Sequence, residues 1–302
     1  MKTQSVTVAR GNAVTLLIRT MRPRQWVKNL FVFSPLLFSR HLFDTSILAL
    51  SLVGFALFSL TASTIYIIND IIDAETDRLH PVKRLRPLAS GALSTVVAGT
   101  AAGVIGFTAV ALSFAIHTRF GVVILAYLVM NIVYSLFLKR AVIIDVMTIA
   151  ASFVLRIAAG AVIISVPMSE WLLICTSLLA LFLGFSKRRH EITVLEEDAH
   201  IHRPVLLEYN TYFLDQMTSL VTASTLICYI LYTVSPETVD KFGSKNLLLT
   251  VPFVLYGLFR YLYLVHKRNT GGDPTAELLS DTPLILNIAL WAASVVIIIY
   301  MR

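Results

Sequence analysis

The residues best suited to chemistry form one short acidic stretch, which contains Asn69, Asp70, Asp73 and Asp77. On a helix, Asn69, Asp73 and Asp77 are spaced four apart with Asp70 between them, which predicts that the four side chains share one face. Oxygen ligands of this kind suit Mg²⁺, which takes a few carboxylates together with waters and substrate phosphates. Acids at the end of a helix also oppose its dipole, so a purely decorative role is disfavoured. We therefore predict a magnesium site at Asn69, Asp73 and Asp77, and Asp70, Asp73 and Asp77 are the candidate catalytic residues.

A basic stretch with Lys83, Arg84 and Arg86 follows directly after these acids. Cations beside a carboxylate-bound Mg²⁺ are what a diphosphate needs, because they neutralise its remaining charge and stabilise it as it leaves. The alternative is that each cation merely marks the cytoplasmic side of a membrane protein. The sequence leaves both interpretations open for any single residue.

A second charged cluster contains Lys187, Arg188 and Glu191. Lys187 and Glu191 are spaced i, i+4, and Arg188 lies three before Glu191, so the three side chains are neighbours on a helix. One carboxylate among several cations suits a phosphate better than a second metal ion. A helix end held by ordinary salt bridges is the competing interpretation.

Two ionisable residues belong to one apolar segment, Asp145 near its start and Arg156 well inside it. A charge at that depth is expensive, so Arg156 is expected to face a polar cavity or a partner, unless it reaches outward along the helix. Asp145 is the better candidate for contact with substrate.

The elements that must position these residues are membrane spans. The chain has 302 residues, of which 57% are hydrophobic and 14% charged, whereas an ordinary soluble domain has roughly 25% charged residues. Apolar runs near the roughly 20 residues needed to cross a bilayer recur along the whole chain. We expect an all-α integral membrane protein with about nine spans in a single domain, 1–302, of which residues 1–13 form a flexible cytoplasmic arm. The expected spans are 14–38, interrupted by a basic stretch at 22–28, then 46–68, 95–117, 120–138, 142–166, 171–186, 213–234, 247–265 and 284–300.

The distribution of charge predicts the orientation in the membrane. With nine spans, 18 of the Lys and Arg residues fall on the side of the N-terminus and five on the opposite side. The positive-inside rule then places the N-terminus in the cytoplasm. This localisation of the net charge of +7 favours membrane lipids over nucleic acid as the partner. Acids gather on the same side, 14 of 18, which again indicates a metal or phosphate site there.

The acid-rich span end, the stretch from Tyr134 through Arg140 and the nine expected spans together resemble the UbiA superfamily of intramembrane prenyltransferases. Three longer motifs more narrowly resemble the decaprenyl-phosphate phosphoribosyltransferase family. They cover residues 22–29, 69–87 and 187–191. The resemblance implies Mg²⁺-dependent transfer of 5-phosphoribose from 5-phosphoribosyl diphosphate to a polyprenyl phosphate, with diphosphate leaving, for the synthesis of cell-wall or glycolipid precursors.

The resemblance also assigns roles. Asn69, Asp73 and Asp77 would hold the Mg²⁺ and diphosphate. The remaining expected substrate contacts divide between the diphosphate (Lys83, Arg84, Arg86), the phosphoribosyl or acceptor phosphate groups (Lys187, Arg188, Glu191) and the lipid phosphate (Arg24, Lys28), with Tyr134, Lys139, Asp145 and Arg156 as further candidates.

The chain departs from typical UbiA prenyltransferases at the second cluster, which in that family is rich in acids and places a second metal. Cations there favour a substrate pair with additional phosphate. A prenyltransferase that uses a prenyl diphosphate donor on an aromatic or glycerophosphate acceptor is the first alternative. An ion-coupled transporter or flippase is the second, but it would place its charges nearer the middle of the membrane. The expected location is the cell (inner) membrane, and a homo-oligomer is left open.

Overall fold

The computed structural model describes residues 12–79, 82–195, 204–267 and 274–301, and every regular element in these ranges is a helix. The N-terminal arm expected at 1–13 and the motif residues His80 and Pro81 lie mostly outside the described ranges. The helices are α1 (Ala13–Met21), η1 (Pro23–Phe33), α2 (Ser34–Phe38), α3 (Thr45–Ile72), α4 (Ala74–Leu79), η2 (Lys83–Leu85), α5 (Thr95–Ile116), α6 (Thr118–Leu136), η3 (Leu138–Arg140), α7 (Ile144–Ile163), α8 (Glu170–Leu195), η5 (Pro204–Glu208), α10 (Thr211–Val234), α11 (Pro236–Phe242), η6 (Asn246–Thr250), α12 (Val251–Lys267), α13 (Pro274–Ser280) and α14 (Thr282–Tyr300).

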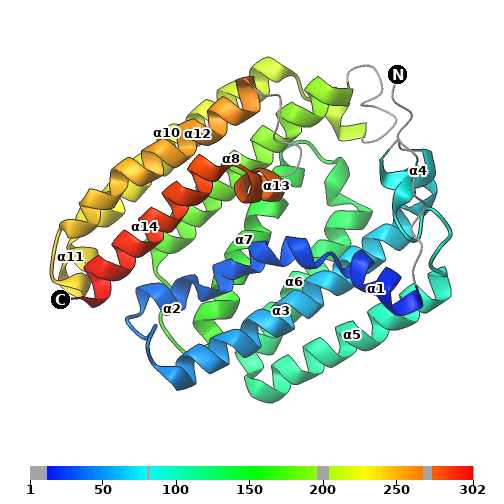
Figure 1. Ribbon diagram of the computed structural model, residues 1–302, viewed down its shortest axis with the longest axis horizontal. Helices are drawn as coiled ribbons and strands as arrows, with labels where there is room; N and C mark the ends of the chain where they lie inside the picture. Colours follow the sequence, from blue (N-terminus) through cyan, green and yellow to red (C-terminus); the bar gives the residue numbers. More distant parts are fainter. Residues whose placement is uncertain (1–11, 80–81, 196–203, 268–273, 302) are drawn as a thin grey trace.

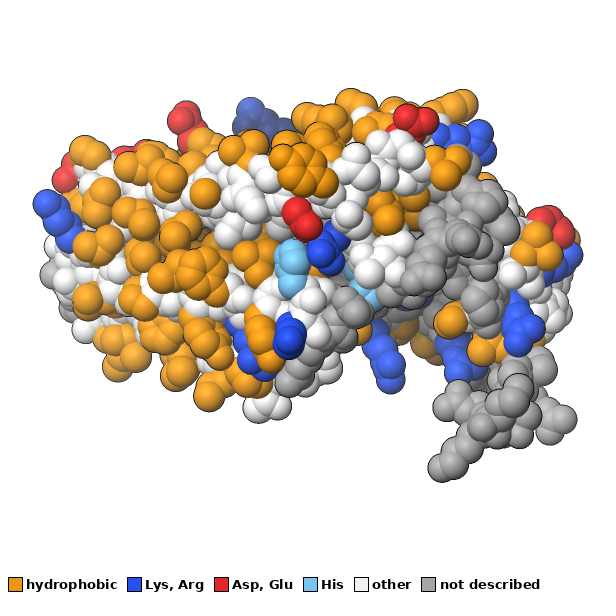
Figure 2. Space-filling model, turned by 90° about the horizontal axis from the view of Figure 1, so that it is seen from above, with side chains coloured by type: hydrophobic (Ala, Val, Ile, Leu, Met, Phe, Trp, Pro, Cys, Tyr) orange, Lys and Arg blue, Asp and Glu red, His pale blue; other side chains and the backbone are white. Residues whose placement is uncertain are grey.

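Eight helical segments in the described part of the chain are long and apolar enough to cross a membrane. They confirm the expected second to ninth spans, and their ends agree to within a few residues except at α8. That helix continues to Leu195, beyond the span end expected at Ser186, and it carries the second charged cluster on its last turns, in agreement with the helical spacing of that cluster. Figure 2 shows hydrophobic side chains spread over one face of the molecule, as lipid contact requires. The chain is a multi-pass membrane protein.

The first expected span is a broken segment instead of one helix. α1 ends at Arg22, whose backbone has a left-handed φ of 54°, and a 3-10 helix, η1, follows with proline at its start. At about 2.0 Å per residue, η1 together with the short α2 measures roughly 30 Å, enough to cross the hydrocarbon core. In Figure 1 the segment runs along α3 in the opposite direction, from the end near α4 to the end near α2.

Polar contacts inside the protein hold this broken segment against α3 and α7. Trp26 Nε1 donates to Ser63 Oγ at 3.0 Å, and Asn29 Nδ2 donates to Ser59 Oγ at 3.0 Å. On the α7 side the backbone of η1 approaches Gly160 so closely that an added Cβ there would lie 2.0 Å from the Val32 carbonyl oxygen. Glycine is therefore required at 160 by the close approach of two backbones.

The two ends of the bundle differ in their chemistry. α4 lies at one end in Figure 1, while α11 and the C-terminus lie at the other. The acidic stretch expected from the sequence ends α3 and forms α4, so it belongs to the first end. Side chains cap several of the spans, as when Asn210 Oδ1 accepts from the Phe213 N–H at the start of α10, which fixes where these helices enter the bundle.

Candidate active site

The acidic stretch continues the helical path of α3 with one irregular residue, Asp73, between α3 and α4. The Asp73 N–H donates to the Asn69 carbonyl at 2.9 Å, and the Asp77 N–H donates to the Asp73 carbonyl at 2.8 Å. These are the i, i+4 bonds of an α-helix, so the four-residue spacing predicted for the acids is kept across the irregularity.

Asp70 and Asp77 face a group of cations and are nearly fully buried. Arg86 bridges them: its Nη1 lies 3.1 Å from Asp70 Oδ1 and also donates to Asp77 Oδ2. Arg22, at the break between α1 and η1, donates to the same Asp70 oxygen. Lys83 Nζ lies 4.0 Å from Asp77 Oδ1. Pairing with several cations is what allows two carboxylates to be buried here.

Asn69 and Asp73 face a different neighbour, the end of α6 and η3. Asn69 Oδ1 accepts a hydrogen bond from Ser135 Oγ, and Lys139 Nζ donates to Asp73 Oδ1 at 2.8 Å. The expectation that all four side chains share one face is therefore too simple, because successive residues on a helix point about 100° apart. Asp70 with Asp77, and Asn69 with Asp73, form two adjoining stripes.

The oxygen-bearing side chains of Asn69, Asp73 and Asp77 are of the chemical type that binds magnesium. Within the described ranges no group of three or more His, Cys, Asp or Glu side chains is arranged to hold a metal. Magnesium, however, is usually bound by one or two carboxylates, with waters and substrate phosphates as the other ligands. Asp73 is the more exposed of the two candidate carboxylate ligands, with 39% of its side chain accessible. It lies four residues before Asp77, so the two side chains are one helical turn apart.

Lys83 connects the two charged clusters electrostatically. Burial lowers its pKa below the ordinary 10.5, and Arg86 lowers it further, while Asp77, Glu191 and Asp73 act in the opposite direction. Glu191 belongs to α8, so its influence on Lys83 shows that the second cluster faces the first. The sequence predicted the two clusters separately, and the fold brings them to one region.

The second cluster is internally paired. Lys187 Nζ lies 3.9 Å from Glu191 Oε1, which agrees with the expected i, i+4 relation. Arg188 is buried, with its Nε 2.9 Å from Asp145 Oδ2 and its Nη1 donating to Glu191 Oε2. Tyr134, on α6, lies in the neighbourhood of Arg188. Asp145 thus contributes to this cluster from α7, through an arginine.

Arg156 is buried between helices, where polar groups of the protein itself surround its guanidinium. Its guanidinium donates to Asn29 Oδ1 at 3.0 Å, to the carbonyl and hydroxyl of Ser152 at 2.7 and 2.9 Å and to the Tyr127 hydroxyl at 3.0 Å. It also stacks over the ring of Phe58, 5.3 Å from the centroid. These contacts tie η1 to α7 and α6, and no carboxylate pairs with Arg156 among the described residues.

Three of the predicted substrate-binding residues lie at the edge of the charged region, with their side chains partly or largely accessible. Arg24 and Arg84 are exposed and Lys28 is half-buried, positions from which a cation can meet a phosphate at the membrane surface.

Sequence reasoning did not single out Arg22, Ser135 or Tyr209 as site residues. Arg22 was visible only as one more basic residue, and a serine or tyrosine in an apolar sequence gives no signal of its own.

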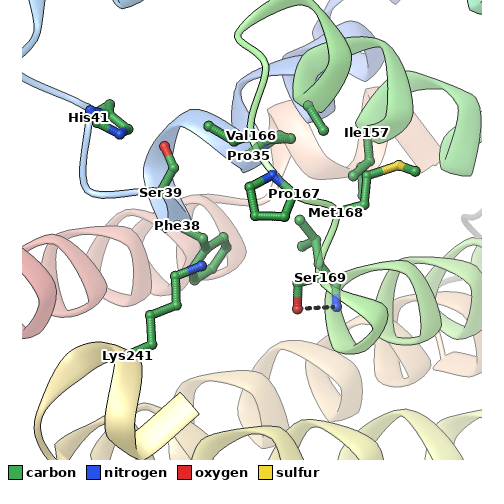
Figure 3. Close-up of a pocket in the computed structure, with 12 residues that line it drawn as sticks. Pro35, Phe38, Ser39, His41, Ile157, Val166, Pro167, Met168, Ser169 and Lys241 are labelled. Carbon is green, nitrogen blue, oxygen red and sulfur yellow. Dashed lines mark hydrogen bonds between the residues drawn. The ribbon is translucent and has the colours of Figure 1, made fainter. Parts of the chain in front are cut away.

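A separate cavity of about 190 Å³ lies among α2, α7, α8 and α11. Phe38, His41, Met168 and Lys241 are among the residues that line it, and Figure 3 shows them around the opening. No predicted site residue borders this cavity, so it belongs to the other end of the bundle and not to the charged clusters.

The fold and the two clusters define a helical membrane protein that gathers acids and phosphate-binding cations at one end of its bundle. The chain belongs to the UbiA prenyltransferase family, whose pattern matches residues 30–300. It is 31% identical over 96% of its length to decaprenyl-phosphate phosphoribosyltransferase of Mycobacterium tuberculosis, of which 96% is covered. The protein of the same name from Corynebacterium glutamicum is 30% identical over 94% of the chain and 86% of its own length.

Solved structures confirm the fold. A UbiA homolog from Archaeoglobus fulgidus bound to GPP and Mg²⁺ superposes with a TM-score of 0.69 at 20% identity, covering 94% of this chain and 99% of that one. A digeranylgeranylglyceryl phosphate synthase superposes with a TM-score of 0.66 at 16% identity, covering 97% and 100%. At these identities the likeness concerns architecture.

Proposed function

We propose that this enzyme transfers 5-phosphoribose from 5-phosphoribosyl diphosphate to a polyprenyl phosphate of the decaprenyl type. The name shared by the two relatives described above, at 31% and 30% identity over nearly the whole chain, supports this reaction. The observation in the structure that supports it is that the second cluster, with Lys187 and Arg188 beside Glu191, lies near the first cluster, so that cations are available for a second phosphate group next to the diphosphate.

The acids and cations of the first cluster are suited to the diphosphate end of the donor. Asn69, Asp73 and Asp77 would hold Mg²⁺, which would supply positive charge to offset that of the leaving diphosphate. Arg86 and Lys83, now paired with Asp70 and Asp77, can donate to the remaining diphosphate oxygens. Arg84 lies next to them at the surface.

The second cluster is suited to the transferred group and the acceptor. Lys187 can neutralise the incoming phosphate, and Glu191 can accept hydrogen bonds from ribose hydroxyls. Lys139, which donates to Asp73, is a further candidate for phosphate binding, as are Tyr134 and Lys28. Positioning and electrostatic stabilisation should supply most of the rate, because a lipid phosphate needs no strong base to act as a nucleophile.

In the reaction, the bond from the anomeric carbon to diphosphate breaks and its electron pair leaves with the diphosphate. A lipid phosphate oxygen forms the new bond to that carbon. Positive charge develops on the ribose in between, as in other glycosyl transfers. The cations of the first cluster stabilise the departing diphosphate, which is where negative charge accumulates.

Orientation follows from the same proposal. The active site should open to the cytoplasm of the cell (inner) membrane, because the donor is a soluble, highly charged metabolite and the basic loops surround the site.

Mass spectrometry of lipid products tests the function. Purified protein is incubated with Mg²⁺ and a mixture of polyprenyl phosphate, aromatic and glycerophosphate acceptors, and with either 5-phosphoribosyl diphosphate or a prenyl diphosphate as donor. We expect a phosphoribosyl lipid with the first donor. Product only from the prenyl donor, with an aromatic or glycerophosphate acceptor, would assign the chain to the other branch of the family.

A further inference from the structure

Tyr209 occupies a position that the reaction described above does not explain. It follows η5 directly and its side chain is buried. Its hydroxyl accepts a hydrogen bond from the Ile143 N–H at 2.6 Å and donates one to Asp145 Oδ1 at 2.8 Å. One hydroxyl thus joins the chain that precedes α10 to the start of α7.

The backbone at Ile143 is strained. Its φ is 68°, a left-handed conformation that a β-branched residue rarely adopts. Such a conformation costs of the order of 1–3 kcal/mol and persists only where its surroundings hold it. The bond to Tyr209 is one of the contacts that hold it. Strain of this kind concentrates at functional sites, and Ile143 lies two residues before Asp145.

Asp145 passes this restraint on to the second cluster. Its side chain is fully buried, as is that of Arg188, and their ion pair measures 2.9 Å. Arg188 holds one carboxylate oxygen of Asp145, Oδ2. Tyr209 holds the other, Oδ1, by its hydrogen bond, so the two partners together fix the orientation of the carboxylate. Arg188 in turn holds Glu191, which faces Lys83 across the site.

We propose that Tyr209 is a positioning residue: by fixing Asp145, it holds Arg188 and through it Glu191 in the alignment that phosphoribosyl transfer requires. The proposal rests on the proposed function. It assigns Arg188 an indirect role, because its guanidinium is enclosed by protein carboxylates. Glu191, with 21% of its side chain accessible, is the member of the relay that substrate can reach.

The protonation state of Tyr209 agrees with this role. Burial raises the pKa of Tyr209 above its ordinary 10.0, and the hydrogen bond to Asp145 raises it further. The hydroxyl therefore keeps its proton and stays a donor to Asp145 throughout the pH range in which the protein is handled.

Steady-state kinetics of Tyr209→Phe test the relay, with Tyr212→Phe as the matched control because Tyr212 is three residues away and 74% exposed. We expect kcat per folded molecule to fall about 10- to 100-fold, the usual effect of a small misplacement of reacting groups. The KM for the donor diphosphate, set by the first cluster, should change less than about threefold. A purely structural role would reduce the folded fraction and leave kcat per folded molecule unchanged, which would overturn the proposal.

A double-mutant cycle with Asp145→Asn checks that Tyr209 acts through Asp145. If it does, Tyr209→Phe has little further effect on kcat in the Asp145→Asn background, whereas additive losses would refute the relay. Asp145→Asn also serves alone if Tyr209→Phe does not fold. The same selective loss of kcat is then expected, and a normal kcat would overturn the proposal.

Hydrogen exchange separates this proposal from the proposed function. The Ile143 amide should be protected in the unaltered protein and exchange faster in Tyr209→Phe, whatever the protein's substrate. If the unaltered protein makes no phosphoribosyl lipid, the proposed function fails, and the exchange of Ile143 still tests the contact. Equal exchange in both proteins would refute the relay even with full activity.

Discussion

The substitution Asp77→Asn tests whether the first cluster contributes more to catalysis than to the stability of the fold. The substitution removes one negative charge and keeps the shape of the side chain. Arg86 would remain paired with Asp70 at 3.1 Å, so it does not become an orphaned buried charge. We therefore expect the free energy of unfolding to fall by about 1–2 kcal/mol, less than the roughly 3–5 kcal/mol for breaking an isolated buried pair.

The loss of activity should be much larger. Asp77 is a proposed ligand of the metal that offsets charge on the leaving diphosphate, and removing one such electrostatic contribution typically costs about 10³-fold in kcat, or roughly 4 kcal/mol. The assay is formation of phosphoribosyl lipid from radiolabelled donor by protein purified in lipid nanodiscs, over a titration of Mg²⁺. The apparent magnesium requirement should also rise.

Glu75→Gln is the matched control. Glu75 lies on α4 near Asp77, its side chain is 82% exposed, and it pairs with Arg78 at 2.8 Å. An exposed pair of this kind contributes about 0–1 kcal/mol, so this variant should keep both stability and activity. If folded Asp77→Asn turned over within about threefold of the unaltered enzyme, the metal assignment would be wrong.

Three further predictions follow from the same contacts. Because the pKa of Lys83 is lowered, its ammonium loses its proton at a lower pH than that of an ordinary lysine, and kcat/KM for the donor should fall as the pH rises toward 10.5. Lys83→Arg should remove that fall. If the two pH profiles were identical, Lys83 would be excluded from diphosphate binding. Arg156→Gln should lower the free energy of unfolding by about 3 kcal/mol, seen as a reduced Tm, since three polar partners lose their donor; an unchanged Tm would contradict this. Gly160→Ala should prevent normal folding because its Cβ would meet the Val32 carbonyl oxygen at 2.0 Å, while Gly103→Ala, with nothing within 4 Å, should be tolerated; equal yields of folded protein would disprove the close approach.

The spans were predictable because a bilayer imposes one requirement on every crossing segment. Long apolar runs satisfy it, and the helices from α3 to α14 follow them closely. The acidic stretch was predictable for a related reason, since polar residues at a span end stand out against their surroundings. The spacing of Asp73 and Asp77 also survives in the backbone hydrogen bonds.

The pairing of the charges was not predictable from local patterns. Arg86 meets Asp70 across 16 residues, and Lys139 meets Asp73 across 66. Such partners depend on which helices become neighbours, and the sequence of one helix does not carry that information. The same holds for Tyr209, whose hydroxyl reaches Ile143 from 66 residues away.

The break in the first segment was signalled but could not be resolved. Arg22 to Lys28 was visible as a basic interruption of an apolar run. A pattern of 3.6 residues per turn has no means of showing that the chain continues as a 3-10 helix. Its partners decide that, because Asn29 and the Val32 carbonyl lie against α3 and α7.

The broken segment has a consequence for how the protein is made. Within lipid, every backbone polar group must find a partner inside the protein, and a stretch that carries Arg24, Lys28 and Asn29 is a poor substrate for insertion on its own. One partner of Asn29, Arg156, is synthesised 127 residues later. The contact between Asn29 and Arg156 therefore forms only after α7 has been synthesised, so the N-terminal segment acquires its full set of partners late, although it is made first.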